Sequence, residues 1–98
     1  MQLVGRERLD AFVRKHADTR SWVEAWIAEV TDENTKWKGP QDIKARYASA
    51  SFLANRVVIF NVKGNSYRLE VQVSFNIGTV VVKWVGTHGE YDKRNAAR

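Results

Sequence analysis

Residues 56–69 carry the feature that most constrains the fold, because they read as one strand, a tight turn and the start of a second strand. From 57 to 62 nearly every side chain is β-branched or aromatic, which favours an extended backbone. Gly64 and Asn65 interrupt this run, and both residue types tolerate the positive φ that a two-residue hairpin turn requires. The stretch therefore predicts a β-hairpin.

Closing the hairpin at that turn fixes which residues face each other across it. The predicted cross-strand pairs are Val62–Tyr67, Asn61–Arg68, Phe60–Leu69 and Val58–Val71. This register collects the apolar side chains on one face and leaves Asn61 and Arg68 on the other. A slip of one residue would put Arg68 opposite an apolar partner, so the pattern specifies the register.

A third strand is predicted at residues 79–87, after a turn at residues 76–78. Pairing Asn76 with Thr79 would place Trp84 on the apolar face of the sheet. The predicted mixed face carries Arg68, Glu70, Gln72 and Lys83. The strand is expected to end at His88, with a basic tail after it.

The residues before the hairpin predict helices. Apolar side chains recur at helical spacing in residues 6–16 and again in residues 22–30, and each set forms one stripe. A short strand is predicted at residues 2–4. A third, short helix is predicted at residues 41–47, with Pro40 at its first position.

The second helix carries two tryptophans, Trp22 and Trp26, whose four-residue spacing beside a sheet predicts packing in the core. Ser21 and Glu24 have the spacing of a capping box at its start. Asp18 is the alternative N-cap.

Helices first and a meander last predict an α+β fold, with N-terminal helices packed on one face of a small, mainly antiparallel β-sheet. One domain spanning residues 1–98 is expected, since 44% hydrophobic residues and 11 aromatics suffice for one core. The absence of cysteine fits a reducing cytoplasm. No apolar run approaches the ~18 residues of a membrane span, and no signal peptide is evident, so a cytoplasmic protein without a membrane partner is expected.

The net charge of +5 is unevenly distributed. Residues 1–40 carry seven basic and seven acidic side chains, whereas residues 41–98 carry nine basic and four acidic ones. A basic excess of this kind suits a polyanion or an acidic protein partner. A solvated, solubilising surface is the alternative.

The sequence contains no Gly-rich phosphate loop, no serine triad signature and no metal-ligand spacing, so neither metal nor cofactor is expected. His16 lies on the apolar stripe of the first helix, where a structural histidine is the better interpretation. His88 differs, because it ends a strand next to a glycine and three residues before Tyr91.

His88, Arg68, Lys83 and Tyr91 together are the parts needed to cleave RNA without a metal. Histidine exchanges a proton near neutral pH. Arginine fits a phosphate with a fixed fork of donors, lysine adds a mobile positive charge, and tyrosine can stack on a base. Attack of a 2′-OH on the adjacent phosphate needs a proton acceptor, a proton donor and cationic stabilisation.

Each of these residues also has a structural alternative. Arg68 could be a partner of Glu70 or Asn61, and Lys83 a partner of Glu70. Tyr91 could cover the end of the core, and His88 could cap a strand. Spacing alone leaves both interpretations open.

Two segments, FNVKGNSYRL at residues 60–69 and THGEYD at residues 87–92, resemble the HigB family of toxins within the RelE-like superfamily. The stretch GPQDIK and the helical first half are similar too, so the resemblance covers most of the chain. By position it implies a site of Arg68, His88 and Tyr91, to which the strand pattern adds Lys83. Four more basic residues are candidates to contact RNA: Arg56, Lys63, Lys93 and Arg94. Lys63 stands where a glycine is more usual in this family.

The resemblance implies a RelE-like fold and a toxin of a bacterial two-gene toxin–antitoxin module. It implies an endoribonuclease that cleaves mRNA on the translating ribosome and is inhibited by a cognate HigA-like helix-turn-helix antitoxin. A non-catalytic RNA- or ribosome-binding module using the same basic face is the alternative. A degenerate toxin that serves only as a protein-interaction partner is a third hypothesis.

Overall fold

The structure is a computed structural model that describes residues 1–96. Its strands are β1 (Gln2–Val4), β2 (Ser51–Phe52), β3 (Val57–Val62), β4 (Tyr67–Ser74) and β5 (Thr79–Thr87). Its helices are α1 (Arg6–Lys15), α2 (Arg20–Thr31), α3 (Pro40–Arg46) and α4 (His88–Ala96), with 3-10 turns at Ala17–Thr19 and Ala54–Arg56. The strand order is β1-β5-β4-β3-β2, and β1 runs parallel to β5 while the other neighbours are antiparallel.

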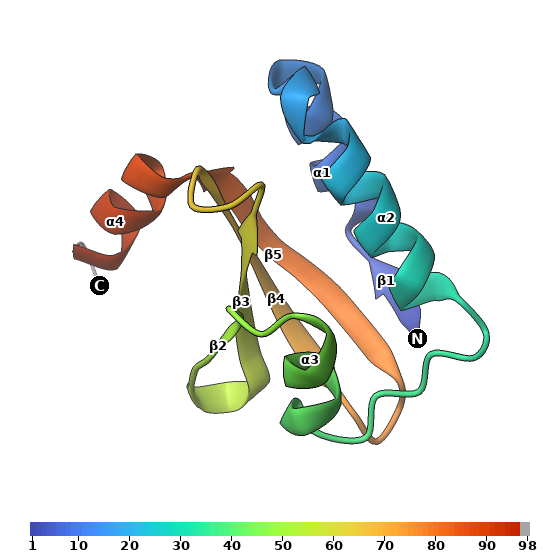
Figure 1. The fold of residues 1–98 in the computed structure, drawn as a ribbon. Coiled ribbons are helices and arrows are strands. Elements are labelled where there is room, and N and C mark those ends of the chain that lie inside the picture. The colour runs from blue at the N-terminus through green and yellow to red at the C-terminus, as the bar shows by residue number, and fades with distance from the viewer. Residues whose placement is uncertain (97–98) are drawn as a thin grey trace.

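The layers confirm the predicted α+β fold. The α1–α2 pair covers one side of the sheet, and α4 lies across the sheet from that pair (Figure 1). Within the described range, none of the helices has the length and hydropathy that crossing a membrane requires.

The predicted hairpin register is confirmed at every pair. Val62 lies opposite Tyr67 and Asn61 opposite Arg68, and β3 and β4 continue in step from there. The turn differs in detail, because positive φ falls on Lys63 (51°) and Gly64 (69°) rather than on Gly64 and Asn65. A lysine in the left-handed region is uncommon, which explains why glycine suits this position better.

The third strand has the predicted bounds but a different register. Ser74, not Asn76, pairs with Thr79, and the Gly78 N–H closes the turn on the Ser74 carbonyl at 2.9 Å. Gly78 adopts a φ of 69°, which glycine allows without strain. The connection is therefore a four-residue loop.

A β-bulge then reverses the orientation of the last part of β5. Val71 pairs with Val82 but Glu70 pairs with Trp84, so Lys83 is the extra residue. An inserted residue moves every later side chain to the opposite face. The prediction that Trp84 lies on the apolar face is therefore wrong, and Trp84 shares the mixed face with Glu70.

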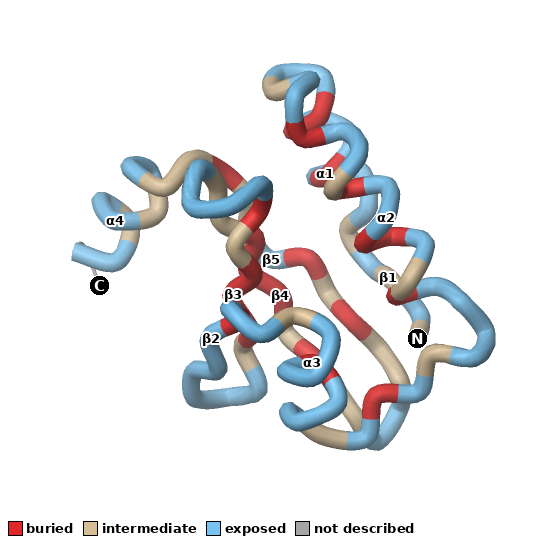
Figure 2. The backbone as a smooth tube through the Cα atoms, viewed as in Figure 1, coloured by how far each residue is buried: buried red, intermediate tan, exposed pale blue. Residues whose placement is uncertain are grey.

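The core lies between the sheet and the α1–α2 pair, where the buried segments of these elements face each other (Figure 2). From the sheet come Leu69, Val71, Val73, Val80 and Val82, and from the helices Leu9, Val23, Trp26 and Val30. The predicted burial of Trp26 is confirmed. Trp22 is half-buried and stacks on Trp26 with ring centroids 6.5 Å apart.

α4 was not predicted, although its sequence contains a start signal. The Thr87 N–H donates to the Glu90 carboxylate at 2.8 Å, and the Glu90 N–H donates to the Thr87 hydroxyl at 3.1 Å. This reciprocal pair is a capping box. It turns the chain from β5 directly into a helix.

The capping box predicted at Ser21 and Glu24 is wrong. α2 begins at Arg20, two residues before the start that a Ser21 cap implies, and Glu24 instead pairs with Arg20 at 3.7 Å on the exposed face. The alternative N-cap, Asp18, does not cap the helix either, and its carboxylate accepts a hydrogen bond from the Tyr67 hydroxyl. Thr19 flanks the helix, but its hydroxyl donates back to the His16 carbonyl at 2.7 Å.

Candidate active site

Two of the predicted site residues, Arg68 and His88, lie at the same end of the sheet, where the β3–β4 turn approaches the junction of β5 and α4. Arg68 pairs with Gly86 across β4 and β5. The His88 N–H donates to the Ser66 carbonyl at 3.0 Å, which ties the first turn of α4 to the hairpin. Arg68 and His88 thus lie on neighbouring chain segments, although 20 residues separate them in sequence.

The Arg68 side chain is held by the hairpin turn rather than by either expected partner. Nη2 donates to the Asn65 side-chain carbonyl at 2.7 Å, and Nη1 donates to the Tyr67 carbonyl at 3.1 Å. A guanidinium has five N–H donors, so donors remain for a phosphate. The turn therefore fixes the position of a cation that is only half-buried.

His88 is oriented by its own helix. Its Nε2 lies 3.3 Å from Oδ2 of Asp92, one turn further along α4, and 43% of its side chain is exposed. Its Nδ1 is buried and has no hydrogen-bond partner within residues 1–96. Nε2 is therefore the nitrogen from which a proton can be exchanged with a ligand. Sequence reasoning missed Asp92, although its i, i+4 spacing from His88 was a usable signal.

Tyr91 and Arg94 cover the mixed face of the sheet near the bulge. The Tyr91 ring lies 5.9 Å from Trp84, and the Arg94 guanidinium lies 5.3 Å from the same indole. Arg94 also forms an ion pair with Glu70, which is 5% exposed. These contacts dock α4 on the sheet. Tyr91 therefore has a packing role, whether or not it also contacts a nucleotide.

Lys83 and Arg56 lie apart from His88. Lys83 is exposed at the bulge, five residues before His88, which is roughly 17 Å along a strand. Arg56 precedes β3, at the end of the sheet remote from the β3–β4 turn, and has a left-handed φ of 62°. The structure therefore brings Arg68 and His88 together but does not bring these two basic residues to them.

A second polar group at this end was not predicted. The Tyr67 hydroxyl donates to the Asp18 carboxylate at 3.0 Å, and Lys63 Nζ lies 3.3 Å from the same group. Desolvation alone would raise the pKa of Asp18, but the hydrogen bonds from Tyr67 and Lys63 outweigh it and lower that pKa. The same carboxylate raises the pKa of the Tyr67 hydroxyl. His16 packs against Tyr67 with ring centroids 5.1 Å apart, as a half-buried residue.

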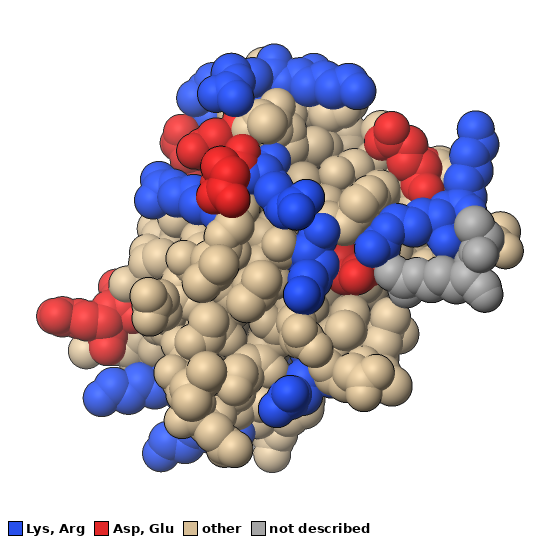
Figure 3. Space-filling model, turned by 180° about the vertical axis from the view of Figure 1, so that it is seen from behind, with Lys and Arg blue, Asp and Glu red and all other residues tan. Residues whose placement is uncertain are grey.

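Lys and Arg side chains gather along the upper part of the molecule between the tip of the α1–α2 pair and α4, and fewer lie at the lower end (Figure 3). The basic side chains of this end include Lys15, Lys63, Arg68, Lys93 and Arg94. Acidic side chains lie among them (Figure 3), and the basic excess of residues 41–98 is what favours a polyanion.

An α+β domain of this topology, with a basic end built around an arginine and a histidine, has the architecture of a RelE-like toxin. The family model of the HigB toxin, described as the RelE-like toxic component of a toxin–antitoxin system, matches residues 19–94. The chain belongs to this family, which confirms the resemblance carried by its two motifs. A toxin of this class has an antitoxin as its partner. The comparison with curated proteins finds no match to the chain.

Proposed function

We propose that this toxin is a ribosome-dependent endoribonuclease that cleaves mRNA in the cytoplasm and is inhibited by a cognate HigA-like helix-turn-helix antitoxin. Membership of a RelE-like family supports ribonuclease activity in general. The observation that carries the proposal is the β4–β5 register, which sets Arg68 opposite Gly86, two residues before His88. A phosphate-binding cation and a proton-exchanging group thereby share one end of the sheet.

The reaction needs no metal. The 2′-oxygen attacks the adjacent phosphorus while the bond to the 5′-oxygen breaks, leaving a 2′,3′-cyclic phosphate and a free 5′-hydroxyl. The 2′-hydroxyl loses one proton and the departing 5′-oxygen gains one. His88 carries one of these two transfers through Nε2 and water carries the other, while Asp92 beside Nε2 stabilises the imidazolium form. Arg68, positioned by Asn65, donates to the phosphate oxygens as charge builds on them.

The remaining candidates have supporting roles. Tyr91 orients or stacks the nucleotide beside Trp84, and Lys83, at the bulge away from His88, is suited to contact a phosphate farther along the RNA. Lys63 and Lys93 border the site and are suited to contact RNA. Two other cations are placed differently, because Arg94 is paired with Glu70 and Arg56 lies at the remote end, where it is suited to a contact with the ribosome.

The test is cleavage of a defined mRNA on programmed ribosomes by the purified protein and its variants. His88→Gln is expected to slow cleavage by about 10²–10⁴-fold if the imidazole transfers a proton. Arg68→Ala is expected to cost roughly 10²–10³-fold, as for loss of a positioned donor at a developing charge. Lys36→Ala is the matched control, since Lys36 is exposed beside the β4–β5 turn at the other end of the sheet.

Ribosome binding and thermal unfolding of the same variants separate catalysis from binding and folding. His88→Gln should bind ribosomes as the wild type does, because it removes no permanent charge at pH 7. Wild-type cleavage by His88→Gln would show that His88 is structural. Ribosome binding without any cleavage by the wild-type protein would favour the non-catalytic RNA-binding module.

A further inference from the structure

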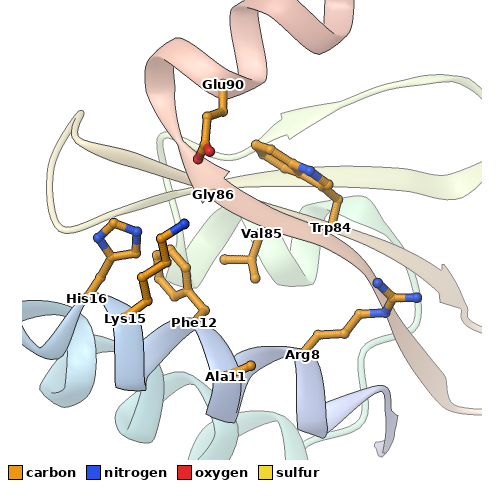
Figure 4. Close-up of a pocket in the computed structure, with 9 residues that line it drawn as sticks. All are labelled: Arg8, Ala11, Phe12, Lys15, His16, Trp84, Val85, Gly86 and Glu90. Carbon is orange, nitrogen blue, oxygen red and sulfur yellow. The ribbon is translucent and has the colours of Figure 1, made fainter.

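A cavity of about 340 Å³ lies between α1 and the last part of β5 (Figure 4). Its volume falls at the lower end of the range for small-molecule sites, about 300–1,000 Å³. β1 pairs with β5 only as far as Val81, so among the described strands the edge of β5 beyond Val81 has β4 as its neighbour on one side and no strand on the other. α1 runs along this open edge, and Glu90 of α4 closes the cavity from above.

The α1 wall of the cavity carries the basic side chains Arg8 and Lys15, and the β5 wall carries the indole of Trp84. Lys15 and His16 lie toward one end of the cavity with Glu90, whereas Arg8 and Trp84 lie toward the other end (Figure 4). The lining backbone of β5 includes Gly86, which pairs with Arg68 of the candidate active site. The cavity therefore adjoins that site on the side of α1.

The geometry of α1 creates the space. Arg8, Ala11 and Lys15 follow at i, i+3 and i+7, which puts them on one face of the helix. Seven residues of helix rise by about 10.5 Å, so two long cationic side chains are spaced along the cavity. Ala11 stands between them with a single methyl group, and this leaves the gap open.

Within residues 1–96, neither the Arg8 guanidinium nor the Lys15 ammonium takes part in a hydrogen bond or an ion pair. The charge of Lys15 acts on Glu90 from a greater distance, where it helps to lower the pKa of that carboxyl. By contrast, Arg68 is held by Asn65, and Lys63 is held by Asp18. Unpaired cations beside an indole are the pattern that binds single-stranded nucleic acid.

We infer that this cavity binds one nucleotide of single-stranded RNA, with its base against Trp84 and Arg8 and its phosphate at Lys15 and His16. Stacking on an aromatic ring and a guanidinium plane suits any base. Charged donors at the other end suit a phosphate. Glu90 also lies at the phosphate end, where it holds the Thr87 N–H with one oxygen and its charge is partly offset by Lys15 and His16.

One part of the inference rests on the proposed function: the bound nucleotide is placed next to the bond that the enzyme cleaves. Gly86 lines the cavity, pairs with Arg68 and precedes His88 by two residues. A strand of RNA whose scissile phosphate lies at Arg68 can therefore place a neighbouring nucleotide in the cavity. The site would act by positioning the substrate.

The test measures binding of a short fluorescent RNA with methylated 2′-hydroxyls, which cannot be cleaved, to the isolated protein. Ala11→Leu fills the gap without changing charge, and leucine is nearly as good a helix former as alanine. We expect it to weaken binding by at least about fivefold, the lower bound for loss of one stacked base. Ala25→Leu, at a position of α2 that is also exposed, is the matched control and should bind as the wild type does.

Lys15→Ala tests the phosphate end separately. Its affinity should fall, and the slope of log affinity against log salt should decrease by about one, while Lys36→Ala leaves both unchanged. Thermal unfolding of each variant confirms that the fold is retained. Wild-type RNA binding by both Ala11→Leu and Lys15→Ala would overturn the inference.

Two further results separate this site from its alternatives. If Ala11→Leu binds RNA normally but escapes inhibition by the antitoxin, the cavity belongs to the protein partner and the inference is wrong. If the wild type fails to cleave mRNA on ribosomes yet its RNA binding is lost in Ala11→Leu, the nuclease proposal fails and the nucleotide site stands.

Discussion

The two faces of the sheet are held by different physical interactions. On the face toward α1 and α2, Leu69, Val71, Val73 and Val80 are completely buried. On the face toward α4, contacts of defined geometry hold the helix, among them the ion pair of Arg94 with Glu70 and the ring contact of Tyr91 with Trp84. Apolar burial is non-directional and distributes its stabilisation over many contacts, whereas an ion pair depends on the geometry of two groups. The first face is thus the platform that stabilises the fold, and the second face holds α4, which carries His88 of the candidate site.

The largest expected effect breaks the platform. Leu69→Ala should lower the free energy of unfolding by about 2–5 kcal/mol, because a fully buried side chain leaves a cavity. Chemical denaturation followed by circular dichroism measures the change. Ile77→Ala is the control, since Ile77 is 75% exposed in the β4–β5 turn and should change stability by no more than about 0.5 kcal/mol. Equal losses for both variants would contradict the assignment of this face as the core.

A smaller effect is expected when the ion pair under α4 is removed. Arg94→Ala takes away the guanidinium that contacts the buried Glu70 carboxylate, at a cost of about 1–3 kcal/mol. Lys93→Ala removes the same charge from the exposed neighbouring position and should be nearly neutral. Denaturation of both variants gives the comparison. Identical stabilities would mean that α4 is not docked through Glu70.

The capping box should matter next, and mainly within α4. Thr87→Ala removes the hydroxyl that accepts the Glu90 N–H, which should destabilise the helix by about 1 kcal/mol. Thr87→Ser keeps the hydroxyl and should retain most of the protection of the α4 amides against hydrogen exchange. Amide hydrogen exchange resolved by residue is the measurement. Loss of protection in β4 as well as α4 would show that the helix and the sheet open as one unit.

The smallest effect is a dependence of α4 on acid. The Thr87 N–H holds the pKa of Glu90 below its ordinary value of 4.5, with the Thr87 hydroxyl as the second cause. A carboxyl with a lowered folded-state pKa contributes stability above its ordinary pKa, and this contribution is lost as pH falls through the folded-state pKa. The chemical shift of the Glu90 side-chain carboxyl carbon should therefore begin to change only below about pH 4.5. Glu90→Gln should abolish this part of the titration.

The hairpin and the core were predictable because both follow from alternation. A slip of one residue in the pairing would turn Arg68 toward the apolar face, and Gly64 marks the turn that sets the pairing. The prediction of which face of residues 67–74 packs in the core, the one with Leu69, Val71 and Val73, is therefore confirmed. The position of Arg68 in the candidate site followed from this local pattern.

The junction of β5 with α4 was not predictable in the same way. Thr87 and Glu90 have capping-box spacing, but so do Ser21 and Glu24, where no such cap forms. A capping signal shows where a helix can begin, and packing decides whether it does. α4 is held by Trp84, which no local pattern places on that face.

The sequence by itself determined the hairpin, its register, the apolar face and the motifs that identify the HigB family, because these depend on neighbouring residues and on a period of two. Only the tertiary structure decided the pairing of β4 with β5, since a register shifted by two residues, as between Asn76 and Ser74 opposite Thr79, buries the same face. It also decided the bulge at Lys83, which turns Trp84 toward α4. That choice depends on the free energy of packing elements distant in sequence, and it sets both the docking of α4 and the cavity beside α1.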